Sequence, residues 1–456
     1  MPQRRIDVVL DSVRRLIRLG ATANLVNLLH KQHPADLAQV FGELGEKDRA
    51  TAFWLLVERN GKLAMEALSE LGPEAGAALL ADRSADEIAR LLQELPSDDA
   101  AAIVDYLPEP LSASVLELIE RRPGDEVGEL LEYDEQTAGR IMNPKVFALS
   151  EDMTVGEAIT TLQGARDVEM VFYLYVVDGR RHLVGVISLR RLLLVPPPTP
   201  LKRIMTTDLI SVRTGTDQEE VARQVASYNL LAVPVVDDEN KLVGVITVDD
   251  VIDVIKDEAT EDIYRLAGVS ADERVFTPMQ DSLRKRFPWL LVNLATAFAA
   301  TGVIALFDAT TAAWAALVKF MPIVPGMGGN AATQTLTVIV RGLALGELTW
   351  ANARKALLKE VLVGVGNGVA TGVVAALATW LLGGQPIIGL LLLVAMIFNL
   401  FVAGAAGTLI PLGLKALKFD PALASTVFIT TFTDVCGFAS FLGFAALYLH
   451  HGPRPS

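Results

Sequence analysis

The sequence predicts a multidomain chain with an all-α superhelical N-terminal domain, an α/β module in two copies, and an all-α five-helix transmembrane domain. Charge divides the chain unevenly. Residues 1–286 carry 32 Lys and Arg against 49 Asp and Glu, a net charge of −17, whereas residues 287–456 carry 8 against 5. Residues 287–456 are apolar, and an internal repeat lies between the N-terminal helical region and this apolar part. Acidity in the soluble half argues against a nucleic-acid partner, because phosphates require Lys and Arg.

Residues 1–130 have the pattern of short amphipathic helices. Apolar residues recur at helical spacing, as in Ile88, Leu91, Leu92 and Leu95. Ser84 precedes this run with a glutamate three residues later, which is a capping-box spacing. We expect a small superhelix of helical hairpins. The first residues contain no apolar segment of the signal-peptide kind, so no cleaved signal is expected.

Residues 137–255 contain one pattern twice, at 137–195 and at 200–255. The recurring pieces are IMNP at 141–144 with IMTT at 204–207, YVVD at 175–178 with PVVD at 234–237, and VGVIS at 184–188 with VGVIT at 243–247. Each copy is typical of a helix, a buried strand, a turn, a second strand and a closing helix. The proline run at 196–198 predicts a stiff linker between the copies.

An acidic connecting helix is predicted at 250–282. Asp250, Asp253, Asp257 and Glu261 fall on one face of it, because residues three and four apart are neighbours. Like charges at that spacing destabilise an isolated helix. The stripe is therefore either a solvated face or one that hard divalent cations neutralise, since these prefer carboxylate and water oxygens.

The transmembrane domain, residues 287–456, contains five apolar segments of membrane-spanning length, at 287–307, 314–340, 358–382, 386–414 and 422–449. Lys and Arg precede the first span and occur between the second and third and between the fourth and fifth. The positive-inside rule then predicts a cytoplasmic (inner) membrane protein with its N-terminal domains in the cytoplasm and its C-terminus outside. The single cysteine, Cys436, excludes an intrachain disulfide.

The second span contains two prolines and three glycines within residues 322–334. We expect them to break the helix in mid-membrane, which is tolerated only where backbone is buried or lines a wet cavity. Freed carbonyls, Asn330 and Gln334 would then offer oxygen ligands to a cation. The alternative is a glycine-rich seam for helix packing.

The last span carries a single acid, Asp434. An ionised carboxylate in hydrocarbon is costly, so such acids usually face a bundle interior or a wet path. Thr426, Thr430 and Asp434 share a helical face. One carboxylate among neutral oxygens suits an ion that keeps its waters, as Mg²⁺ does, although the residues alone do not separate it from Mn²⁺, Co²⁺ or Ca²⁺. The alternative is a structural acid hydrogen-bonded to a neighbouring helix.

The repeated module resembles a tandem CBS-domain pair. Such pairs are regulatory and often bind adenine nucleotides, with a Ser or Thr and an Asp after the last strand holding the ribose. Thr247 and Asp250 match these positions in the second copy. The first copy has Ser188 but Arg191 in place of the Asp. The resemblance implies ATP binding at the second copy rather than the first.

The whole chain resembles an MgtE-type magnesium channel. The local matches are GMGGNAATQ at 326–334, DEATEDI at 257–263, and the segments 420–423 and 433–435. The resemblance implies a homodimer in the lipid bilayer, with a Mg²⁺ pore on its two-fold axis. It implies pore-metal positions at Asp434, Asn330, Gly326, Thr426, Thr430 and Asp420. Thr426 departs from the Asn that is usual in the family.

The resemblance also implies feedback, in which cytosolic Mg²⁺ bridges the soluble domains and closes the pore. The implied regulatory metal positions are Glu66, Asp98, Asp217, Glu219, Asp250, Asp253, Glu258, Glu261 and Asp262. Ala102 and Asn229 stand where the family often has acids. Because the regulatory sites then contain fewer carboxylates, we expect the pore to close at a somewhat higher Mg²⁺ concentration.

Other functions weighed from the sequence are a less selective transporter of divalent cations such as Co²⁺ or Mn²⁺, another CBS-regulated membrane transporter, and a nucleotide sensor anchored by its spans. Asp434 and the scarcity of Lys and Arg within the spans argue against an anion path. No nucleophile–base set or phosphate-binding Walker loop is visible, which argues against an enzyme.

Overall fold

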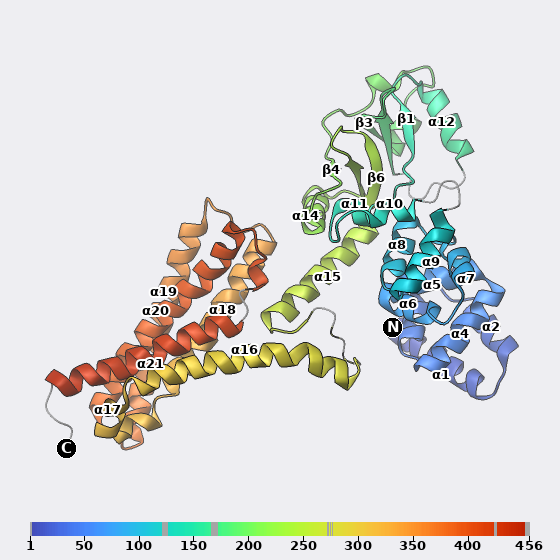
Figure 1. Cartoon of the computed structure of the whole chain (residues 1–456). Helices are drawn as coiled ribbons and strands as arrows, with labels where there is room; N and C mark the ends of the chain where they lie inside the picture. Colours follow the sequence, from blue (N-terminus) through green and yellow to red (C-terminus); the bar gives the residue numbers. More distant parts are fainter. Residues whose placement is uncertain are drawn as a thin grey trace. The chain divides into compact units, whose positions relative to one another are not determined.

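The computed structural model describes residues 2–120, 126–165, 172–270, 273, 275, 277–423 and 426–451. The chain separates into two compact units, Met1–Ile255 and Lys256–Ser456, which Figure 1 shows coloured along the sequence. Each unit is described by itself below.

The first unit begins with helices that pack mainly on their second neighbours along the chain. α3 packs against α5, α6 against α8, and α7 against α9, as expected for a superhelix. Ser84 caps α7 by accepting a hydrogen bond from the backbone of Glu87, which confirms the predicted helix start. The helices are α1 Pro2–Arg18, α2 Thr22–Leu29, α3 Pro34–Gly42, α4 Glu46–Arg59, α5 Gly61–Leu71, α6 Pro73–Leu80, α7 Ala85–Leu92, α8 Ser97–Asp105, α9 Glu109–Glu120, α10 Val127–Leu131 and α11 Ala138–Ile141.

The repeat folds as two three-stranded sheets with one topology. In each sheet the first strand pairs parallel to the second, and the second pairs antiparallel to the third. Equivalent residues occupy equivalent positions in the two registers, with Leu174 opposite Ile187 and Val233 opposite Ile246. The elements are β1 Ala148–Ser150, α12 Val155–Gly164, β2 Tyr173–Val177, β3 Leu183–Ser188, α13 Leu189–Leu194, a 3₁₀ turn Leu201–Arg203, β4 Val212–Arg213, α14 Gln218–Tyr228, β5 Ala232–Val236 and β6 Leu242–Thr247.

The two copies interlock through their repeated motifs. Asn143 of the first copy exchanges backbone hydrogen bonds with Val245 in the second, and Thr206 of the second copy pairs in the same way with Val186 in the first. The strand glycines leave room for this contact, because a Cβ on Gly244 would lie 2.6 Å from the sulfur of Met142. The methionine and the glycine of the repeat are therefore explained by one contact.

The second unit contains long apolar helices. They are α16 Met279–Ala305, α17 Asp308–Ala313, a 3₁₀ turn Ala315–Lys319, α18 Ile323–Ala344, α19 Ala353–Leu381, α20 Pro386–Ala416, a 3₁₀ turn Pro421–Leu423 and α21 Thr426–His451. Among the described residues, α16, α19, α20 and α21 are long and apolar enough to cross a membrane. The second of the five predicted spans corresponds to α18, a shorter helix that packs against α20 and α21.

Two sequence-based expectations for helix limits are wrong. α18 runs unbroken from Ile323 to Ala344, and the chain breaks before its glycines rather than among them. Pro325 fits there because the first N–H groups of a helix have no intrahelical partner. The connecting helix α15, Val248–Leu266, ends well before residue 282, and Gly268 follows it with a φ of +69°. Glycine adopts that left-handed conformation without strain.

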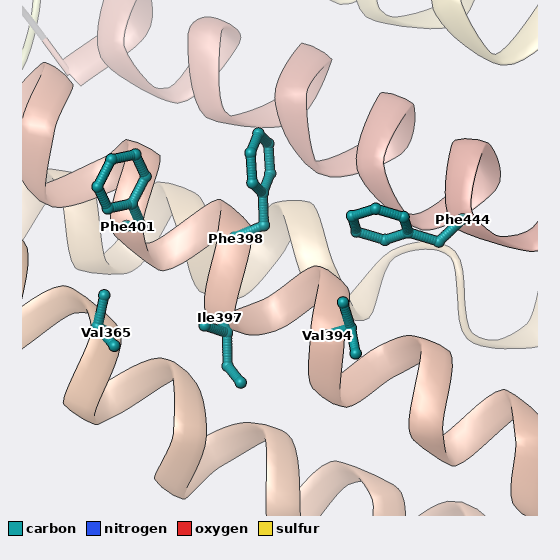
Figure 2. Close-up of a pocket in the computed structure, with 6 residues that line it drawn as sticks. All are labelled: Val365, Val394, Ile397, Phe398, Phe401 and Phe444. Atoms are coloured by element: carbon teal, nitrogen blue, oxygen red, sulfur yellow. The ribbon is translucent and has the colours of Figure 1, made fainter.

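α19 and α20 pack closely along a glycine seam. Gly364, Gly368 and Gly372 recur at every fourth position of α19, and a Cβ on any of them would lie within 3.2 Å of the α20 backbone. Small residues at this spacing are typical of membrane helices in close contact. Beside the seam, α19, α20 and α21 line an apolar cavity of about 320 Å³, and Figure 2 shows its six aliphatic and phenylalanine side chains.

Candidate functional site

One face of α18 carries exposed polar side chains. Asn330, Gln334 and Thr337 are exposed and recur every three or four residues, and Gly326 lies one turn before them. Val338 is the one large apolar side chain exposed in the interior of this helix among the described residues. A polar face on an apolar helix requires a wet path or a protein partner, because hydrocarbon cannot satisfy it.

α21, which carries Asp434, packs against α18. A Cβ on Gly329 would lie 3.3 Å from Cγ2 of Thr430, so the two helices nearly touch there. Asp434 follows Thr430 by one turn and is half-buried. Within the described part of the chain, no hydrogen bond or ion pair engages its carboxylate. The alternative of a structural acid bonded to a neighbouring helix therefore has no support in this fold.

Asp434 and its neighbours do not form a metal cage within one chain. Across the described residues, no group of three or more His, Cys, Asp or Glu side chains is placed to hold a metal ion. The hydroxyl of Thr430 donates to the backbone oxygen of Val427 at 3.2 Å, which leaves its oxygen lone pairs open. The structure thus brings Gly326, Asn330, Thr430 and Asp434 onto two packed helices without completing an ion site.

Thr426 and Asp420 contact the connecting helix. The hydroxyl of Thr426 donates to the backbone oxygen of Leu266 at 3.0 Å. Asp420 forms an ion pair with Arg265 and accepts a hydrogen bond from the backbone of Ala422 at 2.8 Å. Through these contacts, the two predicted pore residues attach the end of α15 to the start of α21.

The C-terminal part of α15 carries an acidic cluster. Glu261 pairs with Arg265. Burial, followed by the nearby carboxylates of Asp420 and Glu258, raises the pKa of Asp262 to about 6. Three predicted regulatory residues, Glu258, Glu261 and Asp262, thus lie together with Asp420.

The first unit contains a second acidic cluster, where α8 meets the start of α15. Burial and the carboxylates of Asp250 and Asp99 raise the pKa of Asp98 well above its ordinary value. Burial likewise raises the pKa of Asp250 to about 6, with Asp249 and Asp99 adding to the effect. The Oδ1 atom of Asp98 is buried without a hydrogen-bond partner in the described structure. Buried acids without a counter-ion favour protonation or the binding of a cation.

Asp250 also occupies the predicted nucleotide position. Its Oδ2 atom accepts hydrogen bonds from the hydroxyl of Thr247 at 2.6 Å and from the backbone of Thr247 at 3.2 Å. In the first copy, Ser188 caps α13 by accepting from the backbone of Arg191. The Thr–Asp pair is thus assembled only in the second copy, but its carboxylate also belongs to the acidic cluster.

The remaining predicted regulatory residues lie in other surroundings. Glu66 is exposed on α5 and pairs with Lys62 at 3.9 Å. Asp217 caps α14, where Glu219 faces Arg223 at 3.7 Å. Asp253 is exposed on α15.

Two buried polar residues of the apolar unit escaped the sequence analysis. Glu360 on α19 is 5% exposed and bonds to Thr335 at 3.2 Å and to Lys359 at 2.7 Å. Asn399 is fully buried in the middle of α20. The sequence feature that could have identified them is the one that identified Asp434, namely a polar side chain within a predicted apolar span.

Family models match most of the chain. The MgtE divalent cation transporter model matches residues 321–444, the MgtE intracellular N domain matches 32–136, and the CBS domain matches 138–196 and 201–257. The match to the N domain and the two CBS matches confirm the predicted helical and α/β parts.

Relatives and solved structures agree with these matches. Magnesium transporter MgtE of Enterococcus faecalis is 37% identical over 72% of this chain and 72% of its own length. The protein of the same name from Thermus thermophilus is 37% identical over 73% and 74%. The crystal structure of the cytosolic domain of the Mg²⁺ channel MgtE in complex with ATP is 38% identical, with a TM-score of 0.50, and covers 54% of this chain and 99% of that one. The chain belongs to the MgtE family of divalent cation transporters.

Proposed function

We propose that the chain mediates selective Mg²⁺ uptake across the cytoplasmic (inner) membrane. The observation that carries this proposal is the half-buried carboxylate of Asp434, unpaired among the described residues, on the helix that packs against the polar α18. An ion that keeps its waters suits one carboxylate surrounded by neutral oxygens, and Mg²⁺ dehydrates reluctantly. The names of the relatives support magnesium over other divalent ions. A less selective carrier of Co²⁺ or Mn²⁺ is the second candidate.

The working unit is a homodimer. The side chains of Asn330, Gln334 and Thr337 are exposed within the part of the chain that the structure describes. A second copy related by a two-fold axis would bring two such faces together around water and pair two Asp434 carboxylates. Gly326, Asn330 and Thr430 would then contact the waters of the ion. The membrane potential favours inward movement by about 2.3 kcal/mol per charge per 100 mV.

Cytosolic Mg²⁺ closes the path by binding to the acidic clusters. Asp98, Asp99 and Asp250 repel one another when ionised, and a divalent cation would remove that repulsion. The second cluster, Glu258, Glu261 and Asp262, lies where α15 is fastened to α21 through Asp420 and Thr426. Neutralising it would fix the end of α15 against the transmembrane helices. Weaker Mg²⁺ sites are proposed at the other regulatory positions, Glu66, Asp217, Glu219 and Asp253.

ATP is proposed to bind at the second CBS copy through Thr247 and Asp250. A relative's cytosolic domain has been solved with ATP, and the Thr–Asp pair is assembled here by a 2.6 Å hydrogen bond. Because Asp250 also faces Asp98 and Asp99, nucleotide and Mg²⁺ would act on one carboxylate. The two ligands are therefore expected to influence each other.

Mg²⁺ flux into proteoliposomes containing the full-length chain tests the function. The wild type should conduct at low Mg²⁺ on the cytosolic face and stop at high Mg²⁺. Asp434→Ala should abolish selective flux. Asp308→Ala removes an exposed acid from the start of α17 and should leave flux unchanged. Selective flux through Asp434→Ala would refute the proposal, whereas equal Co²⁺ and Mg²⁺ flux through the wild type would favour the less selective transporter.

A further inference from the structure

Asn399 lies where three helices of the transmembrane unit meet. It is on α20, it is fully buried, and it faces the first turn of α18 on one side and Gly437 of α21 on another. Its Nδ2 atom donates to the backbone oxygen of Val324 at 2.9 Å. The nitrogen has to face that oxygen, because the amide oxygen in its place would meet a second acceptor.

The other half of the amide has no comparable contact. The Oδ1 atom is buried and has no hydrogen-bond partner among the described residues. A buried acceptor without a partner costs free energy, and an apolar side chain of the same shape would avoid that cost. Stability alone therefore does not explain an asparagine at this position.

Glycines on both neighbouring helices make room for the amide. A Cβ on Gly328 of α18 would lie 2.0 Å from Asn399 Nδ2, and a Cβ on Gly437 of α21 would lie 2.9 Å from it. Gly328 precedes Asn330 by two residues, and Gly437 follows Asp434 by three. The amide thus contacts both helices of the candidate ion site within one turn of its polar side chains.

We propose that Asn399 is the positioning residue of the ion path, and that it sets the place of the first turn of α18 relative to α21. It holds Val324 by a hydrogen bond and Gly437 by contact, so that Asn330 and Asp434 face the ion from fixed positions. The assignment of these two residues to the ion rests on the proposed function, whereas the positioning of the helices does not. Functional sites tolerate displacements of only about 0.5 Å.

The first test replaces Asn399 by leucine in the full-length chain. We expect Asn399→Leu to fold with an unchanged or raised melting temperature, while the KM for Mg²⁺ flux into proteoliposomes rises about tenfold, the effect typical of residues that hold metal ligands in place. A lower melting temperature with an unchanged KM would assign Asn399 a purely structural role and overturn the proposal.

A pair of compensating substitutions, one that enlarges Gly328 and one that shortens Asn399, separates a positioning role from simple space filling. Gly328→Ala should lower the melting temperature sharply, and Asn399→Ala in the same chain should restore it by vacating the space. The double variant still lacks the bond to Val324, so its KM should stay raised. A normal KM in the double variant would refute positioning. Gly437→Ala is the matched control, because Asn399→Ala should not rescue it: its Cβ would also lie 3.0 Å from the Pro325 backbone.

The native cysteine provides a readout that does not require transport. Cys436 is the only cysteine of the chain, is half-buried, and lies next to Gly437 on α21. A shift of α21 in Asn399→Leu should change the rate of its reaction with N-ethylmaleimide severalfold. Wild-type protein without Mg²⁺ flux would refute the proposed function but leave this measurement valid, and an unchanged rate would refute the positioning.

Discussion

α18 and α19 are consecutive helices of one apolar unit, yet α18 exposes mainly polar side chains and α19 mainly aliphatic ones, with exceptions such as Val338 and Asn367. α19 exposes leucine and valine along its length, including Leu362, Val373 and Leu377, as expected for a helix that faces lipid. α18 exposes Asn330, Gln334 and Thr337. The glycines differ as well: Gly368 faces the α20 backbone, whereas Gly326 faces open space. The comparison separates a helix that packs against its neighbour from a helix that we propose lines the ion path.

The largest effect is expected on stability, when a glycine of α19 or of α18 is replaced by alanine. Gly368→Ala would place a Cβ 2.7 Å from the Cα of Ile397, so the backbones of α19 and α20 must move apart. We expect a loss of about 3 kcal/mol, at the upper end of the usual cost of overpacking, and a correspondingly lower melting temperature in detergent. Gly326→Ala should leave the melting temperature unchanged. Equal melting temperatures for the two variants would contradict the claim that Gly368 is needed for helix packing and Gly326 is not.

The exposed faces provide the next test. Asn330→Leu should lower Mg²⁺ flux by roughly 10- to 100-fold, because a leucine cannot hydrogen-bond the waters of the ion and favours a dry constriction. Val373→Leu on α19 is the matched control and should leave flux unchanged, since it exchanges one lipid-facing aliphatic side chain for another. Similar flux through both variants would mean that the polar face of α18 does not contact the ion.

The contrast between the two helices could be predicted only in part from the sequence. The repeat, the superhelix and Asp434 were visible because they depend on periodicity and on a lone charge in an apolar run. The limits of α18 were not, since Pro325 and the glycines look like a break until Pro325 is found in the first turn, where its missing N–H costs nothing. The roles of Asn399 and Thr426 depend on contacts with distant segments, at Val324 and Leu266, and no local pattern reports these.

The end of α15 is attached to α18 and α21, and we expect this attachment to control the proposed ion path. Leu266 at the end of α15 packs in a cluster with Ala332 and Leu336 of α18. Arg265 holds this end of α15 through its ion pair with Asp420. Arg265→Gln should weaken that attachment and raise the cytosolic Mg²⁺ needed for half-closure about tenfold, an ordinary coupling energy between two sites. Arg354→Gln, at the start of α19, is the control and should leave the half-closing concentration unchanged.

The smallest expected effect concerns protons at the first acidic cluster, far along the sequence from either helix. Burial raises the pKa of Asp250 to about 6 and also raises that of Asp98, so the folded chain binds protons there that the unfolded chain has already released. Without divalent cations, stability should therefore fall as pH rises from about 4 to 6 and then stay low. Asp250 is about one-quarter ionised at pH 5.5 and almost fully ionised at pH 7.5, so Mg²⁺ should bind there about fourfold more weakly at the lower pH.

Hydrogen exchange of residues 97–105 and 247–255 in the full-length chain, titrated with Mg²⁺ at both pH values, measures this difference. Asp250→Asn should remove the pH dependence that this residue contributes while Asp98 keeps a part of it. Asp208→Asn is the control, since Asp208 is an exposed acid before β4 to which no metal role is assigned. A Mg²⁺ midpoint that is the same at both pH values would mean that the cluster is not where cytosolic Mg²⁺ acts. The control of the α18 path would then have to reside in Glu258, Glu261 and Asp262 at the other end of α15.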